Sequence, residues 1–99
     1  MRNKFEVFWS NESIVRTDQI IKFLFSKWTE KEVLIFLSEL KSFEVIVSNF
    51  PEIYPKSQLK KCYRKAVINK QISIIYSIEN NSILVHTLFD NRQDPAKLK

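Results

Sequence analysis

The spacing of apolar residues changes along the chain from strand-like to helix-like and then back to strand-like. Residues 5–9 are short, aromatic and β-branched, which predicts a first strand. Ser10 and Asn11 follow it, and both side chains can accept hydrogen bonds from the first turn of a helix. A first helix is therefore predicted to about residue 28. Its apolar positions are Ile14, Ile21, Leu24, Phe25 and Trp28.

A second helix is predicted to start at about residue 30, because Thr29 and Glu32 have the spacing of a capping box. Pro51 ends it. Since so few residues separate the two helices, we expect them to fold back as an antiparallel hairpin. The face of the second helix that should be buried carries Val33, Phe36, Leu37, Leu40, Val47 and Phe50.

After Pro51 the pattern indicates a loop over residues 52–59 and then three strands, over 62–68, 71–79 and 82–89. Asn80 and Asn81 suit a tight hairpin turn between the last two strands. One face of the middle strand is expected to hold Ile72, Ile74, Tyr76 and Ile78, with Tyr76 in the core. One face of the last strand is expected to hold Ile83, Val85, Thr87 and Phe89, with His86 opposite them.

The predicted order is β-α-α-β-β-β, an α+β fold. The last three strands should form an antiparallel meander that the first strand joins, so that the helix hairpin packs on a small antiparallel sheet. We expect residues 1–99 to form a single domain in which residues 90–99 are a polar C-terminal tail.

Composition excludes several classes of function. The chain has no glycine, which excludes a phosphate-binding loop and a dinucleotide fingerprint. Cys62 is its one cysteine, which excludes an internal disulfide and a multi-cysteine zinc site. We therefore expect no cofactor and no metal. No apolar run approaches the roughly 18 residues that span a bilayer, and residues 1–5 lack a following signal-peptide segment. The expected location is the cytoplasm, with no membrane partner.

The net charge of +5 lies entirely in the second half of the chain. Residues 1–50 carry seven basic and seven acidic side chains, whereas residues 51–99 carry nine basic and four acidic ones. Between Glu52 and Glu79 there is no acidic residue, and six basic ones fall in that gap: Lys56, Lys60, Lys61, Arg64, Lys65 and Lys70. A basic surface of this kind indicates an acidic partner, either nucleic acid or protein, or else a solvated face with no partner.

The last third of the chain resembles the C-terminal signature of the RelE/ParE toxin superfamily. The resemblance lies in Arg64 on the second strand, Tyr76 inside the third, and Asn91-Arg92-Gln93-Asp94-Pro95 after the fourth. The element order is similar over nearly the whole length. The resemblance implies a toxin of a bacterial type II toxin–antitoxin system, associated with plasmid stabilisation and growth inhibition, and neutralised by a cognate antitoxin.

Two branches of that superfamily imply different targets. RelE-like members are ribosome-dependent endonucleases that cut messenger RNA, and they use a cluster of Lys and Arg with a C-terminal Tyr. ParE-like members bind and poison DNA gyrase. Here Ser73 stands at the position of a nuclease Arg, and Leu98 at that of the Tyr. The ParE-like branch, with no enzymatic activity, is therefore favoured.

The resemblance and the charge together give the candidate site residues. A target or antitoxin is expected to contact Lys60, Lys61, Arg64, Lys65 and Arg92. In a nuclease, Arg64 and Arg92 would stabilise the charge of the reacting phosphate, and His86 or a lysine would have to replace the missing base. A basic nucleic-acid-binding module that is not a toxin remains a third interpretation. The oligomeric state is left open between a homodimer and a hetero-oligomer with the antitoxin.

Overall fold

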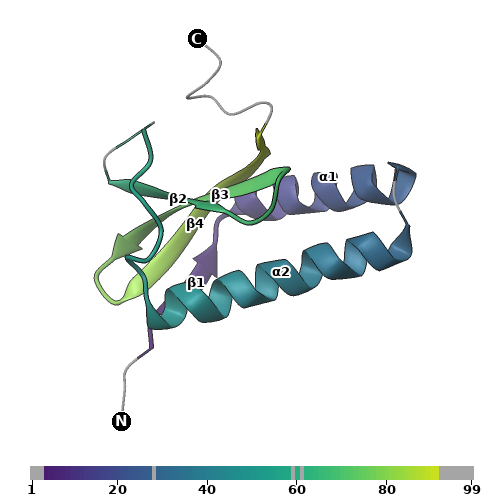
Figure 1. Ribbon diagram of the computed structural model, residues 1–99. Coiled ribbons are helices and arrows are strands. Elements are labelled where there is room, and N and C mark those ends of the chain that lie inside the picture. The colour runs from purple at the N-terminus through teal and green to yellow at the C-terminus, as the bar shows by residue number, and fades with distance from the viewer. Residues whose placement is uncertain (1–3, 28, 59, 61, 92–99) are drawn as a thin grey trace.

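The computed structural model describes residues 4–27, 29–58, 60 and 62–91. Its order of elements is β-α-α-β-β-β, which confirms the predicted α+β class. Figure 1 shows the two helices side by side, with α2 lying across one face of the sheet. The elements are β1 (Glu6–Trp9), α1 (Asn11–Lys27), α2 (Glu30–Asn49), β2 (Tyr63–Val67), β3 (Ile72–Glu79) and β4 (Ser82–Asp90).

Both helix starts are capped as the sequence predicts. The Ser10 hydroxyl oxygen accepts a hydrogen bond from the N–H of Ser13 at 3.1 Å. At the start of α2, the N–H of Glu32 donates to the Thr29 hydroxyl at 3.3 Å, and the N–H of Thr29 donates to the Glu32 carboxylate at 3.1 Å. This reciprocal pair is a complete capping box, and it separates the two helices.

The sheet is mixed rather than antiparallel. Its strand order is β1-β4-β3-β2, in which β1 pairs with β4 in parallel and the other two pairs are antiparallel. The predicted antiparallel pairing of the first strand was therefore wrong. The reason is the even number of helices: α2 returns to the end where β1 begins, where the N–H of Phe5 donates to the Ser48 carbonyl at 3.0 Å. A three-strand meander that starts from this end finishes with β4 running in the direction of β1.

The core lies between α2 and the sheet. Phe43 is 1% exposed and stands among Trp9, Tyr54 and Tyr76, with ring centroids 5.7–6.3 Å apart. Tyr76 is fully buried as expected; its hydroxyl donates to the Pro51 carbonyl at 2.6 Å, and burial raises its pKa to about 12. The remaining core residues are Val33, Phe36, Leu40, Val47, Ala66, Ile72, Ile74, Ile83, Val85 and Leu88.

Three residues placed on helix core faces lie on the surface instead. Ile14, Leu37 and Phe50 are 55%, 41% and 57% exposed, because the small sheet cannot cover both helices. Trp28 and the side chains of Leu24 and Phe25 lie outside the described residues.

The last strand contains a β-bulge that its sequence does not announce. Ile75 pairs with Thr87, but the next residue of β3, Tyr76, pairs with Val85, so His86 is the additional residue. Beyond the bulge the alternation is shifted by one residue. Leu88 therefore joins the core in place of the predicted Thr87 and Phe89. The Asn80-Asn81 turn is as predicted, with Asn80 at a positive φ of 58°.

Candidate functional site

The face of the sheet opposite α2 carries a cluster of polar and aromatic side chains, which we call the His86 cluster: Lys60, Tyr63, Ser77, Glu79 and His86. Tyr63 and Ser77 are direct cross-strand partners on β2 and β3. The bulge in β4 places His86 beside them. Three strands thus contribute to the cluster, while Lys60 comes from the loop before β2.

Hydrogen bonds link the polar members in a row. The Ser77 hydroxyl donates to the Glu79 carboxylate at 3.0 Å and lies 2.8 Å from Nε2 of His86. Ser77 is only 4% exposed, so solvent water has little access to its hydroxyl. The row therefore runs from an exposed carboxylate through a buried hydroxyl to a partly buried imidazole.

Aromatic stacking and a cation complete the cluster. The rings of Tyr63 and His86 are stacked, with centroids 4.4 Å apart and an interplanar angle of 27°. The Lys60 ammonium lies 5.3 Å from the centroid of the Tyr63 ring, within the range of a cation–π contact. The combination of a stacked aromatic pair and a positive charge suits a planar or anionic partner.

Burial lowers the pKa of His86 from its ordinary value of 6.5. The charge of Lys60 lowers it further, whereas Glu79 and Glu12 act in the opposite direction. The folded protein therefore favours the neutral imidazole near pH 7. A neutral imidazole has one nitrogen that accepts a hydrogen bond or a proton.

The shift in His86 predicts how stability depends on pH. Because the pKa is lower in the folded than in the unfolded state, the unfolded chain binds more protons below about pH 6.5. The contribution of His86 to stability is thus complete above that pH and is lost as the pH falls. We expect His86→Gln to lose less stability than the parent protein between pH of about 7.5 and about 5. Urea midpoints at the two pH values measure this, and equal losses in both proteins would contradict it.

Arg64 does not join the His86 cluster. On β2 it pairs with Tyr76, whereas its neighbours Tyr63 and Lys65 point to the opposite face of the sheet. Its guanidinium donates to the carbonyl oxygen of Tyr54 at 2.7 Å and to that of Glu52 at 3.5 Å. Arg64 thus fixes the loop between α2 and β2.

Two of the expected binding residues lie on the side of the His86 cluster, and two others lie outside the described residues. Lys60 is a member of the cluster, and the Lys65 ammonium lies 5.7 Å from the Phe89 ring centroid. Lys61 and Arg92 belong to the part of the chain that is not described, as does Leu98. The expected contacts of these residues with a target or antitoxin stay predictions.

Ser73, at the position of a nuclease Arg, is fully buried. Its hydroxyl donates to the side-chain oxygen of Asn91, and the Asn91 amide donates in turn to the carbonyls of Asn69 and Lys70 at 3.1 and 3.0 Å. These bonds tie the end of β4 to the turn before β3. Ser73 therefore has a structural role at this position.

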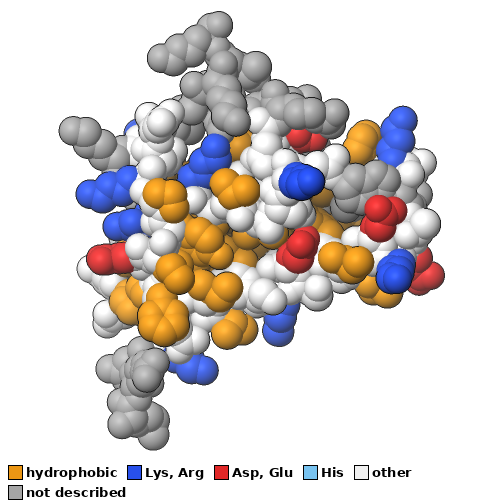
Figure 2. Space-filling model, in the orientation of Figure 1, with side chains coloured by type: hydrophobic (Ala, Val, Ile, Leu, Met, Phe, Trp, Pro, Cys, Tyr) orange, Lys and Arg blue, Asp and Glu red, His pale blue; other side chains and the backbone are white. Residues whose placement is uncertain are grey.

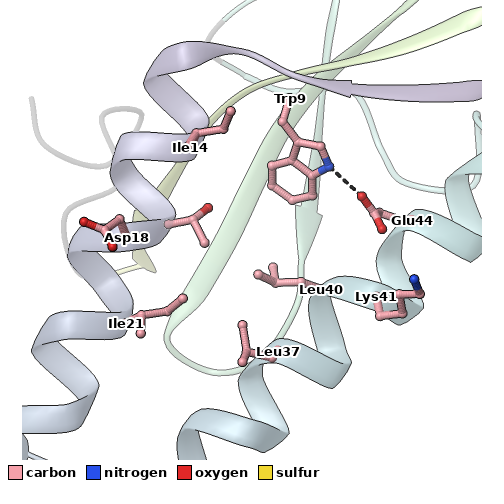
Figure 3. Close-up of a pocket in the computed structure, with 9 residues that line it drawn as sticks. Trp9, Ile14, Asp18, Ile21, Leu37, Leu40, Lys41 and Glu44 are labelled. Carbon is pink, nitrogen blue, oxygen red and sulfur yellow. Dashed lines mark hydrogen bonds between the residues drawn. The ribbon is translucent and has the colours of Figure 1, made fainter.

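A second feature is an apolar groove between the two helices, which we call the helix groove (Figure 3). Trp9 closes one end, and its indole N–H donates to the Glu44 carboxylate at 2.6 Å. The volume is about 370 Å³. The side chains that line it are Trp9, Ile14, Thr17, Asp18 and Ile21 on one side, with Leu37, Leu40, Lys41 and Glu44 on the other.

The helices also leave apolar side chains on the surface outside this groove. Figure 2 shows apolar side chains gathered over the C-terminal part of α2 and the segment that follows it. Those that are at least 47% exposed there and elsewhere on the helices are Ile14, Val15, Phe23, Leu34, Ile35, Val45, Phe50 and Ile53. Contiguous apolar surface of this kind marks an interaction site.

Two properties of the described residues narrow the classes of site. They include no group of three or more His, Cys, Asp and Glu that could hold a metal ion. Among them, no helix is both long and apolar enough to cross a membrane.

Solved structures share this fold over nearly its whole length. A chain of the chromosomal ParDE toxin–antitoxin system of P. aeruginosa superimposes with a TM-score of 0.75 at 8% identity, covering 90% of this chain and 98% of that one. A chain of the E. coli DinJ–YafQ toxin–antitoxin complex gives 0.66 at 13% identity, covering 93% and 98%. The conserved hypothetical protein HP0894 of Helicobacter pylori gives 0.58 at 14% identity, covering 89% and 96%.

The chain therefore has the fold of the RelE/ParE-superfamily toxins, as the C-terminal resemblance predicts. No family model matches the sequence. No curated protein matches it either. Identities of 8–14% establish the shared fold alone.

Sequence reasoning missed most of the His86 cluster. It identified Lys60 from the charge distribution and His86 as the one available imidazole, but not Tyr63, Ser77 or Glu79. A signal was present for two of them, because Ser77 and Glu79 share one face of β3 by strand alternation. The contact with His86 depends on the bulge, which the sequence pattern does not reveal.

Proposed function

We propose that this chain is the toxin of a bacterial type II toxin–antitoxin system, acting as one domain. The observation that carries the proposal is the match over at least 89% of the chain to structures from toxin–antitoxin systems. The uncovered apolar surface of the helices supports it, because a toxin that is neutralised by a protein needs a surface for that protein.

The partner we propose is a cognate antitoxin that occupies the helix groove. Leu37 and Ile14 offer apolar contacts from opposite sides of the groove, at 41% and 55% exposure. An amphipathic segment that is disordered when free could bury its apolar side there. Acidic side chains of the same antitoxin would complement the lysines around β2, in the half of the chain that holds the net charge.

For the target, we propose that the toxin binds and inhibits an essential protein such as DNA gyrase. The buried Ser73 replaces a charged nuclease residue, which supports a mechanism without RNA cleavage. The TM-score of 0.75 with the ParDE chain, against 0.66 with the DinJ–YafQ chain, points the same way. The identities, 8% against 13%, rank the two in the opposite order. Both identities are too low to separate branches, so the fold and Ser73 carry this choice.

A ribosome-dependent messenger-RNA endonuclease is the second candidate, and the His86 cluster is the observation that favours it. A neutral imidazole can accept the proton of a ribose 2′-hydroxyl. The Lys60 ammonium can stabilise the charge that develops on the phosphate, and a base can stack on Tyr63. Under this candidate the catalytic groups are His86 and Lys60. Arg64 then has a structural role, because it is engaged with the Tyr54 and Glu52 carbonyls.

Brief induction in a bacterial host separates the two candidates. A gyrase poison is expected to change plasmid topology and trigger the DNA-damage response while messages stay whole. An early block of translation with cuts at ribosomal A-site codons would instead establish the endonuclease. Absence of any growth defect, together with the absence of an adjoining antitoxin reading frame, would contradict both.

One substitution links the basic surface to the target under either candidate. We expect Lys60→Ala to weaken the effect on the target by roughly tenfold, because a cation beside the contact surface is lost. Lys22→Ala is the matched control, since Lys22 is an exposed α1 lysine that pairs with Asp18 at 3.1 Å. Dose–response of growth against induction level measures both. An equal effect of the two substitutions would show that only overall charge matters.

A further inference from the structure

The Ser77 hydroxyl stands between two acceptors and has a single hydrogen to give. It lies 3.0 Å from the Glu79 carboxylate and 2.8 Å from Nε2 of His86. An ionised carboxylate only accepts hydrogen bonds, so the Ser77 hydrogen must point toward Glu79 for that bond to exist. The Ser77 oxygen is then left to accept a hydrogen from His86.

We propose that Ser77 and Glu79 are positioning residues that hold His86 in the Nε2–H form and leave Nδ1 as a proton acceptor. The hydrogen bonds run in one direction, from Nε2–H of His86 to the Ser77 oxygen, and from the Ser77 hydrogen to Glu79. A neutral imidazole carries one hydrogen, so Nδ1 keeps its lone pair. Within the described part of the chain Nδ1 has no hydrogen-bond partner.

The surroundings strengthen this assignment. Ser77 is 4% exposed, so water does not readily replace either of its bonds. Stacking on Tyr63 holds the plane of the imidazole, since the two rings lie 4.4 Å apart and 27° from parallel. Burial lowers the pKa of His86, which keeps the ring neutral near pH 7. The ring is thus fixed in position, in plane and in the location of its hydrogen.

The use of Nδ1 rests on the second candidate function, whereas the tautomer does not. For an RNA ligand, Nδ1 would accept the hydrogen of a ribose 2′-hydroxyl while Lys60 faces the phosphate. The hydrogen-bond chain itself is a property of the folded protein without any ligand. The two parts of the inference can therefore fail separately.

Nitrogen NMR of the imidazole tests the tautomer directly, and His86 gives the only histidine signals because the chain has one histidine. At a pH where the ring is neutral, we expect Nε2 to carry the hydrogen and Nδ1 to show the signal of an unprotonated nitrogen. In Glu79→Ala the Ser77 hydrogen is free to turn toward Nε2. The ratio of the Nε2–H to the Nδ1–H form should then fall by about tenfold, the effect of losing one hydrogen bond to a charged group. Glu79→Gln keeps an acceptor oxygen and should keep the tautomer.

Glu12→Ala is the matched control, because Glu12, like Glu79, raises the pKa of His86 but makes no hydrogen bond to Ser77. It should shift the titration of His86 and leave the tautomer unchanged. An Nδ1–H form in the parent protein, or no change of tautomer in Glu79→Ala, would overturn the proposal. If the tautomer is as expected but no RNA is cut, the positioning stands and the endonuclease candidate falls. If RNA is cut, Glu79→Ala should lower kcat and move the pH profile while Glu12→Ala leaves kcat near the parent value.

Discussion

Phe43→Ala is expected to lower the free energy of unfolding by about 3–5 kcal/mol, the usual cost of removing a buried aromatic ring. Phe43 is 1% exposed, and it contacts Trp9 from β1, Tyr54 from the loop and Tyr76 from β3. Native domains are stable by only about 5–15 kcal/mol. The variant should therefore be partly unfolded at physiological temperature. Chemical denaturation followed by tryptophan fluorescence measures the loss.

Phe23→Ala is the matched control for this substitution. Phe23 is also a helical phenylalanine, but it is 47% exposed on α1. Its replacement should change the free energy of unfolding by no more than about 0.5 kcal/mol, as for most surface positions. A comparable loss in both variants would mean that the two helices share one buried core, contrary to the exposure of α1.

Local features of this fold were predictable because their causes are local. The Thr29 and Glu32 capping box depends on residues three apart, and both of its hydrogen bonds are formed. The turn at Asn80 requires a residue that tolerates positive φ, and in a chain without glycine asparagine is suited to it. Each of these interactions is closed within a few residues, so the sequence around it is sufficient to predict it.

Features that depend on pairing between distant segments were not predictable in the same way. The parallel pairing of β1 with β4 joins residues 76 apart, Glu6 with Ser82 among them. The bulge at His86 moves Leu88 into the core and Phe89 out of it, although both are apolar and suit either face. Pattern alone does not distinguish one apolar residue from the next. Only the register of the whole sheet does.

The candidate site shows the same division. Alternation along β2 places Arg64 on the opposite side from Lys65, and that much follows from the sequence. The carbonyl groups of Tyr54 and Glu52 that engage Arg64 belong to an irregular loop, and no periodic pattern places them. A run of basic residues therefore indicates a basic region, but not which of its members remain available to a partner.

The largest effect on partner binding is expected from a charge placed inside the helix groove. Leu37→Glu should weaken binding of the cognate antitoxin at least about a hundredfold, because an unpaired carboxylate would be buried against Ile14, Ile21 and Leu40. Leu37 is already 41% exposed, so the free toxin should keep its fold and its toxicity. Cells should then fail to recover when the adjoining antitoxin gene is expressed together with the variant.

Ile35→Glu controls for this change on the same helix. Ile35 is exposed to a similar degree, 48%, but it lies outside the helix groove, on the side of Glu32, Asn69 and Lys70. The antitoxin should neutralise Ile35→Glu as well as it neutralises the parent toxin, and affinities measured by calorimetry should agree with the growth assay. Full rescue of Leu37→Glu would exclude the helix groove as the antitoxin site. Loss of toxicity in Leu37→Glu, with the fold intact by circular dichroism, would reassign the groove to the cellular target, because only a surface used in poisoning the cell is needed when no antitoxin is present.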